Sequence, residues 1–107
     1  MDRNEAIAAL AALAQGTRLD AFRLLVQAGP EGLAAGELAE RLGTSPPALS
    51  FHLKGLTHAH LARARQEGRF VFYSADFDVM RSLVDFLTEN CCGGASCVTP
   101  VCRATGA

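Results

Sequence analysis

Apolar residues recur at helical spacing in five stretches of the chain and alternate with polar residues in a sixth. The five predicted helices span residues 4–14, 18–28, 35–42, 44–59 and 77–90. Residues 62–66 and 70–74 suit strands and flank Glu67, Gly68 and Arg69, which predicts a β-hairpin with glycine at its turn. The pattern therefore predicts a mainly α fold with one small β-hairpin.

The third and fourth predicted helices are separated by a tight turn. Gly43 ends the earlier helix, because glycine readily adopts the left-handed conformation found after a helix. Thr44 or Ser45 caps the next helix, and the prolines that follow are tolerated in a first helical turn. Beyond them a stripe of leucines falls on one helical face: Leu49, Leu53 and Leu56. Two helices joined in this way form a helix-turn-helix, and the hairpin that follows is a wing.

The face opposite this stripe is rich in hydrogen-bond donors and suits insertion into the major groove of DNA. Residues 51–73 hold four Lys or Arg side chains against one Glu, a net charge of +3, which leaves −4 for the rest of a chain whose total is −1. Basic charge concentrated on one segment is typical of phosphate binding. The candidate DNA-binding residues are Ser45, Pro47, Ser50, Phe51, His52, Lys54, Arg63, Arg65 and Arg69.

The arginines of the predicted wing are placed to hold DNA. Arg63 and Arg65 are two residues apart and share one face of their strand, and Arg69 lies at or beside the tip. We expect them to bind backbone phosphates or to reach into the minor groove. The alternative is a hairpin that is basic for solubility. Arg18 and Arg23 of the second helix are alternative phosphate contacts, but a solvated helix face is the favoured interpretation of both.

A chain of 107 residues forms one domain with a small core, so dimerisation would add stability. The last predicted helix is apolar over too wide an arc for one stripe. Together with the alanine-rich first helix it predicts a homodimer interface, and the alternative is that both helices complete the monomer core. No apolar run reaches the length of a membrane span, and the first residues lack the features of a signal peptide. We therefore expect a cytoplasmic protein with no membrane contact.

Four cysteines cluster in the last part of the chain, at Cys91, Cys92, Cys97 and Cys102. A disulfide framework would spread its cysteines across the fold, so this clustering favours metal or redox chemistry. Thiolates are soft ligands, of which three satisfy trivalent arsenic and four would satisfy zinc or cadmium. Glycine and small residues surround them, which predicts a flexible tail at 91–107 after a DNA-binding and dimerisation domain at 1–90.

The predicted order of elements resembles the ArsR/SmtB family of winged-helix metalloregulatory repressors. The segment SPPALSFHLKGLTHAHLARARQEGRFVFYS is similar to the family's recognition helix and wing, and LAQGTRLDAFRLL to its second helix. The resemblance implies a homodimeric repressor that leaves double-stranded operator DNA when an inducer binds. Three features depart from the family: no Cys-x-Cys pair in residues 35–42, no His in the last helix, and His60 in place of a glycine. Either His60 takes a left-handed conformation there, or the turn into the wing differs from that of the family.

The adjacent C-terminal cysteines with a third nearby are similar to the arsenite-responsive branch of that family. This resemblance implies As(III) as inducer, Sb(III) as a second candidate, and no organic cofactor. The implied ligands are Cys91, Cys92 and Cys97, with Cys102 as a substitute third or a fourth ligand. The alternatives are another soft metal, such as zinc or cadmium, redox sensing through a disulfide, and cysteines without a function. A cysteine-based enzyme such as an arsenate reductase is disfavoured, because no His base or anion-binding loop accompanies the thiols.

Overall fold

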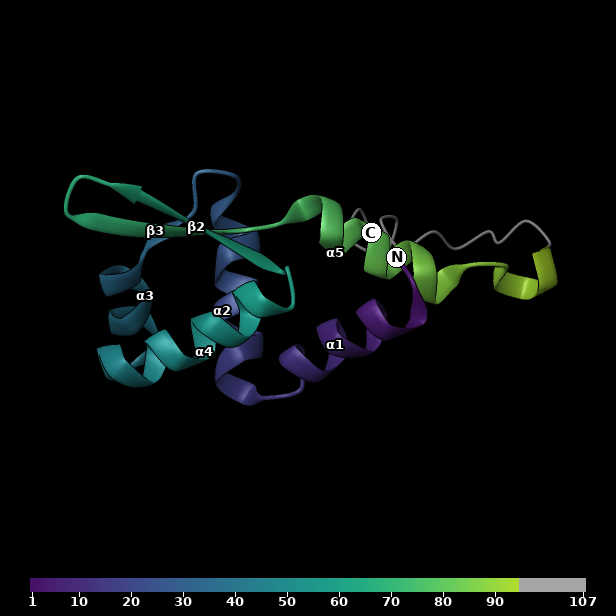
Figure 1. Cartoon of the computed structure of the whole chain (residues 1–107), viewed down its shortest axis with the longest axis horizontal. Coiled ribbons are helices and arrows are strands. Elements are labelled where there is room, and N and C mark those ends of the chain that lie inside the picture. The colour runs from purple at the N-terminus through teal and green to yellow at the C-terminus, as the bar shows by residue number, and fades with distance from the viewer. Residues whose placement is uncertain (95–107) are drawn as a thin grey trace, which may run out of the picture.

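A computed structural model describes residues 1–94, which form five α-helices and three short strands (Figure 1). In chain order the elements are α1 (Arg3–Leu13), α2 (Gly16–Ala28), β1 (Leu33–Ala34), α3 (Ala35–Leu42), α4 (Pro46–His58), β2 (Ala62–Glu67), β3 (Phe70–Ala75), α5 (Phe77–Thr88) and a 3-10 turn, η1 (Cys91–Gly94). The predicted mainly α fold with a helix-turn-helix and a wing is confirmed. None of the described helices is long and apolar enough to cross a membrane.

The sheet has one strand more than the predicted hairpin. β1 pairs antiparallel with β3, so the order across the sheet is β1-β3-β2. Gly32 allows this pairing, because its φ is +73° and a Cβ there would collide with the carbonyl oxygen of Tyr73. A strand of two residues is too short to show an alternating hydrophobic pattern, and the sequence therefore gave no signal for it.

Capping side chains explain where the first two helices begin. Asp2 accepts a hydrogen bond from the Glu5 N–H at 2.7 Å, and the Glu5 carboxylate accepts one from the Asp2 N–H at 2.8 Å. This reciprocal pair is a capping box. α2 begins two residues earlier than predicted, because Gln15 rather than Thr17 caps it, by accepting from the Arg18 N–H at 2.9 Å.

The core lies between the sheet and helices α2, α3 and α4, and leucines fill it. The largest fully buried side chains are Leu25, Leu38, Leu49, Leu53, Leu56 and Leu61, each worth roughly 1.5–3 kcal/mol of burial. They include the predicted stripe of α4. α1 packs on this core through small residues, Ala6, Ala9 and Ala12. Its larger apolar residues Ile7 and Leu10 are 52% and 43% exposed.

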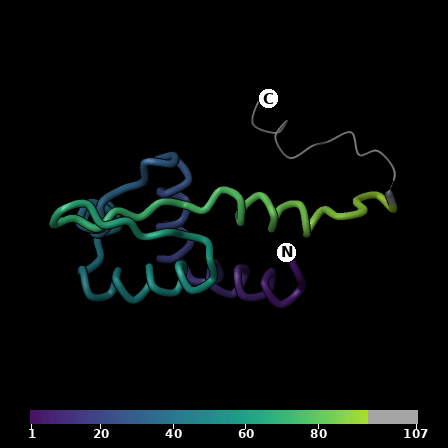
Figure 2. Tube along the Cα trace, turned by 45° about the horizontal axis from the view of Figure 1, so that its top comes forward, coloured from purple at the N-terminus to yellow at the C-terminus, as the bar shows by residue number. Residues whose placement is uncertain are grey.

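α5 points away from the wing and lies beside α1. Figure 1 shows it leaving the end of β3 in the direction opposite to the β2–β3 turn, and Figure 2 shows the same arrangement from a second side. It ends at Thr88, two residues earlier than predicted. Leu83 is its buried residue, whereas Val84 and Leu87 are 36% and 57% exposed. The apolar surplus predicted for this helix therefore lies on the surface of the single chain.

Candidate nucleic-acid interface

α4 presents a polar face to solvent because its leucine stripe is buried beneath it. Ser45 caps the helix by accepting a hydrogen bond from the Ala48 N–H at 3.3 Å, and prolines occupy the first turn, as predicted. Gly43 ends α3 in the predicted left-handed conformation, with φ 63°. The predicted DNA-binding residues of this segment are exposed, apart from the half-buried His52: Ser45, Pro47, Ser50, Phe51 and Lys54.

Arg18 of α2 reaches across to α4 and contacts two of these residues. Its Nε donates a hydrogen bond to Nδ1 of His52 at 3.3 Å, and its guanidinium carbon lies 5.4 Å from the centre of the Phe51 ring. The Phe51 and His52 rings meet edge to face, with 5.5 Å between their centroids. The assignment of Arg18 to a solvated helix face was therefore wrong. Gly55 was the overlooked signal, because a Cβ there would lie 2.6 Å from that guanidinium carbon.

Two wing arginines are held by other groups of the protein. The register of β2 with β3 places Arg63 and Arg65 on one face of the strand, as predicted. Arg63 Nε donates to the Asp76 carboxylate at 3.0 Å. Arg65 donates to the Glu67 carboxylate at 2.7 Å and to the carbonyl oxygen of Glu31 at 3.4 Å. A DNA phosphate has to compete with these acceptors for both guanidinium groups.

The tip of the wing is open to solvent. Gly68 forms the turn in a left-handed conformation with φ 61°. Arg69 beside it is exposed, and Phe70 is 61% exposed. Arg69 therefore occupies the tip position that the hairpin pattern predicted.

Asp76 connects the wing to α5. Besides its ion pair with Arg63, its carboxylate caps α5 by accepting from the Val79 N–H at 3.0 Å, and its own N–H donates to the Leu61 carbonyl at 2.8 Å. Burial raises the pKa of Asp76, but the hydrogen bonds from Val79 and Arg63 outweigh burial, so this pKa lies below its usual value. The two elements are thus joined through one ionised side chain.

The turn between α4 and the wing has the conformation predicted for His60. Its φ is 63°, in the left-handed region that costs a non-glycine residue on the order of 1 kcal/mol. The next residue, Leu61, is fully buried, and its N–H donates to the Leu56 carbonyl at 3.0 Å. Burial of Leu61 therefore fixes the turn from which the wing starts.

Two of the four cysteines lie within the described residues, just after α5. Cys91 and Cys92 are exposed, and their Sγ atoms are 3.5 Å apart. Cys92 and Gly93 have φ values of 59° and 68°, so the backbone turns sharply at this point. The other predicted ligands, Cys97 and Cys102, lie outside the described residues. Within residues 1–94, no three His, Cys, Asp or Glu side chains are grouped so as to hold a metal ion.

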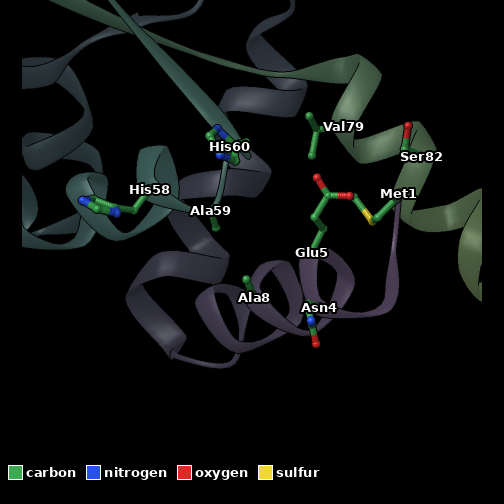
Figure 3. Close-up of a pocket in the computed structure, with 9 residues that line it drawn as sticks. All are labelled: Met1, Asn4, Glu5, Ala8, His58, Ala59, His60, Val79 and Ser82. Carbon is green, nitrogen blue, oxygen red and sulfur yellow. The ribbon is translucent and has the colours of Figure 1, made fainter.

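A hollow of about 480 Å³ lies between the start of α1, the end of α4 and α5 (Figure 3). Glu5, His58 and His60 line it, and Figure 3 shows the two imidazole rings pointing in different directions. Among the described residues, the predicted DNA-binding residues and the thiols of Cys91 and Cys92 do not contribute to its lining. The hollow is therefore separate from the candidate DNA-binding residues and from the two described thiols.

Comparison with known proteins places these features in a family. Residues 13–64 match the helix-turn-helix domain family. The transcriptional activator HlyU of Vibrio cholerae is 32% identical over 94 residues, which cover 86% of this chain and 84% of HlyU. A structure of reduced HlyU from Vibrio cholerae is 33% identical, with a TM-score of 0.61, and the match covers 83% of this chain and 90% of that one.

Two further solved structures extend the comparison. An ArsR-like transcriptional regulator from Rhodococcus sp. RHA1 is 28% identical, with a TM-score of 0.67 and coverage of 78% and 76% of the two chains. The homodimeric winged helix-turn-helix DNA-binding domain Mb0332 of Mycobacterium bovis is 26% identical, with a TM-score of 0.66 and coverage of 90% and 89%. Such relatives are transcriptional regulators rather than enzymes, as predicted. The chain belongs to the ArsR/SmtB family of winged helix-turn-helix, DNA-binding transcriptional regulators.

Proposed function

We propose that this chain is a homodimeric cytoplasmic repressor that leaves its operator when trivalent arsenic binds the C-terminal thiols. The observation that carries the proposal is the exposed pair of adjacent thiols after α5, with Cys91 Sγ and Cys92 Sγ 3.5 Å apart. The exposed face of α4 supports the DNA-binding part. Because the relative HlyU is an activator, repression by this chain is part of the proposal.

α4 is the proposed reading element. Its exposed Ser50, Phe51 and Lys54 offer a hydroxyl group, an aromatic ring and a cation, and a helix fits the major groove, which is about 12 Å wide. Arg69 at the wing tip is the proposed contact to the adjacent backbone or minor groove. Arg63 and Arg65 are proposed to contribute after exchanging their carboxylate partners for phosphates.

Dimerisation is proposed through α1 and α5. Exposed apolar side chains gather on these helices: Ile7, Leu10, Val84 and Leu87. Such surface marks protein interfaces, and the relative Mb0332 is a homodimer. A two-fold dimer would present two α4 helices to half-sites one helical turn of DNA apart. In sedimentation experiments Leu87→Glu should give monomers, whereas Leu19→Glu, a matched change at a 43% exposed residue of α2, should leave the dimer intact.

The thiols fit a soft ion by their chemistry and spacing. A tetrahedral ion with bonds of about 2.3 Å holds its sulfurs roughly 3.8 Å apart, close to the 3.5 Å between Cys91 and Cys92. Trivalent arsenic, and antimony with the same bonding pattern, takes a third thiolate, which we assign to Cys97. Cys102 is the substitute third ligand, or a fourth for zinc or cadmium. Both residues lie outside the described part of the chain.

A gel shift with the promoter upstream of the protein's own gene tests the proposal. The wild type should retard this DNA, and arsenite should release it. Cys91→Ser, Cys92→Ser and Cys97→Ser should bind the DNA but ignore arsenite, while Cys102→Ser decides whether that thiol takes part. Unchanged operator binding at saturating arsenite would exclude the sensor mechanism and leave DNA binding standing.

Redox sensing is the second candidate, and two observations favour it. The Cys91 and Cys92 Sγ atoms are within hydrogen-bond distance, and a structure of the relative HlyU is of its reduced form. In this case two thiols lose two electrons and two protons to an oxidant such as hydrogen peroxide and form a disulfide, Cys91–Cys97 or Cys92–Cys102. Mass spectrometry of the oxidised and arsenite-loaded proteins, paired with the gel shift, identifies which modification releases DNA.

A further inference from the structure

Arg18 stands outside the helix-turn-helix but lies against its second helix. Its half-buried side chain comes from the first turn of α2 and ends beside Gly55 in the middle of α4. Two side chains of the exposed α4 segment meet it: His52 through a hydrogen bond and Phe51 through its ring face. One guanidinium group therefore restrains both rings at once.

The hydrogen bond also determines what His52 can offer to DNA. With Nδ1 accepting the Arg18 N–H at 3.3 Å, Nε2 is the ring nitrogen left to donate. His52 is thereby fixed as an N–H donor at Nε2. The acceptors available to such a donor in the major groove include the N7 and O6 atoms of guanine and the N7 of adenine.

We infer that Arg18 is a positioning residue for sequence recognition, which orients Phe51 and holds His52 as a donor toward a purine edge. Because both rings are already restrained in the free protein, less conformational entropy is lost when the protein binds DNA. Arg18 thus acts through its neighbours rather than as one more phosphate contact. This inference rests on the proposed operator binding by α4.

Gly55 provides a way to move Arg18 without removing it. A Cβ at this position would lie 2.6 Å from the guanidinium carbon, which is the far end of a flexible side chain. A hollow of about 350 Å³, lined by Arg18, Gly55 and alanines of α1, is next to it and can receive the displaced group. Gly55→Ala should therefore fold, since alanine is also the better helix former, while breaking the contact with His52.

The test measures binding of the full chain to operator DNA and to a scrambled duplex of equal length by fluorescence anisotropy. Arg18→Ala, Arg18→Lys and Gly55→Ala should each lower the ratio of the two affinities about tenfold, with scrambled binding nearly unchanged. The double variant Arg18→Ala/Gly55→Ala should lose no more than either single variant, because both remove the same contact. Gly16→Ala, a helical glycine with open space around it, is the control and should keep the wild-type ratio.

Variants of His52 test the donor itself. His52→Gln places an amide N–H near the position of Nε2 and should keep the ratio of operator to scrambled affinity within about threefold of the wild type. His52→Asn places its amide nearer Nδ1 and should lose the preference for the operator. The inference is overturned if Arg18→Ala weakens binding to both duplexes equally, because that result indicates a phosphate contact. It is also overturned if Gly55→Ala leaves the ratio of the two affinities unchanged. Circular dichroism confirms that each variant is folded. If the wild type itself showed no preference for the operator, the proposed function would fail instead.

Discussion

Asp76 stands where the wing meets α5, and its substitution separates two contributions to stability. The side chain caps α5 through the Val79 N–H and pairs with Arg63, each at 3.0 Å. Asp76→Ala removes both interactions. Asp76→Asn keeps a side-chain oxygen that can cap the helix but removes the charge.

The expected magnitudes follow from the geometry. A lost N-cap lowers the free energy of unfolding by about 1 kcal/mol. The ion pair adds about 0.5 kcal/mol, because the Arg63 side chain is 68% exposed and water screens it. Asp76→Ala should therefore cost about 1.5 kcal/mol, or roughly 6–12 °C in Tm for a domain of this size, and Asp76→Asn about 0.5 kcal/mol.

The lowered pKa of Asp76 adds a pH dependence. Because its pKa in the folded protein is below the unfolded value of 3.8, the stabilisation is complete at neutral pH and is lost as the pH falls through the folded pKa. Asp76→Asn has no charge to lose at this site. The difference in the free energy of unfolding between wild type and Asp76→Asn should therefore be constant above about pH 5. In stronger acid this difference should fall toward zero.

Urea unfolding followed by circular dichroism, at a fixed protein concentration from pH 7 to pH 3, measures these differences. Arg63→Ala combined with Asp76→Asn completes a double-mutant cycle for the ion pair. If Asp76→Asn were as destabilised as Asp76→Ala, the capping role would be refuted. A gap between wild type and Asp76→Asn that persists in acid would refute the electrostatic reasoning.

Three further predictions use the same unfolding and binding assays. Gly32→Ala should destabilise the protein by more than about 1 kcal/mol, since the added Cβ meets the Tyr73 carbonyl at a positive φ; Gly16→Ala should not. Leu53→Ala should lower the free energy of unfolding by about 2–5 kcal/mol, because Leu53, on the buried face of α4, is 1% exposed. A loss below about 1 kcal/mol would contradict its core role. Lys54→Ala should weaken operator and scrambled DNA alike and reduce the salt slope by about one; an operator-specific loss would make Lys54 a base contact.

The sequence predicted those parts of the fold that local chemistry determines. The leucine stripe of α4, its Ser45 cap and the left-handed Gly43 each follow from a few neighbouring residues, and all were confirmed. The cap of α2 was missed because Gln15 is not among the usual capping residues. The strand β1 was missed because its existence depends on β3, far along the chain.

The candidate interface shows the same division between local and distant effects. Alternation along β2 correctly placed Arg63 and Arg65 on one face. Their partners were not predictable, because Arg63 meets Asp76 and Arg65 meets the carbonyl of Glu31, 34 positions away. The contact of Arg18 with α4 likewise spans 34 positions. Periodicity shows which face a side chain occupies, whereas its partner depends on tertiary packing.

The distance between the thiols and the DNA-reading face restricts how the proposed signal can travel. Cys91 and Cys92 lie in η1, which follows α5, and Figure 1 shows this yellow segment at the end of the described chain opposite to the β2–β3 turn. A single residue, Asp76, separates β3 from α5, and it is hydrogen-bonded to Leu61 and paired with Arg63. These contacts form one route by which a change in the packing of α5 can act on the base of the wing, and a second runs through α1, which contacts both α5 and α4. Asp76→Asn should consequently reduce the response of operator binding to arsenite more than operator binding itself, and an undiminished response would place the coupling in the dimer interface alone.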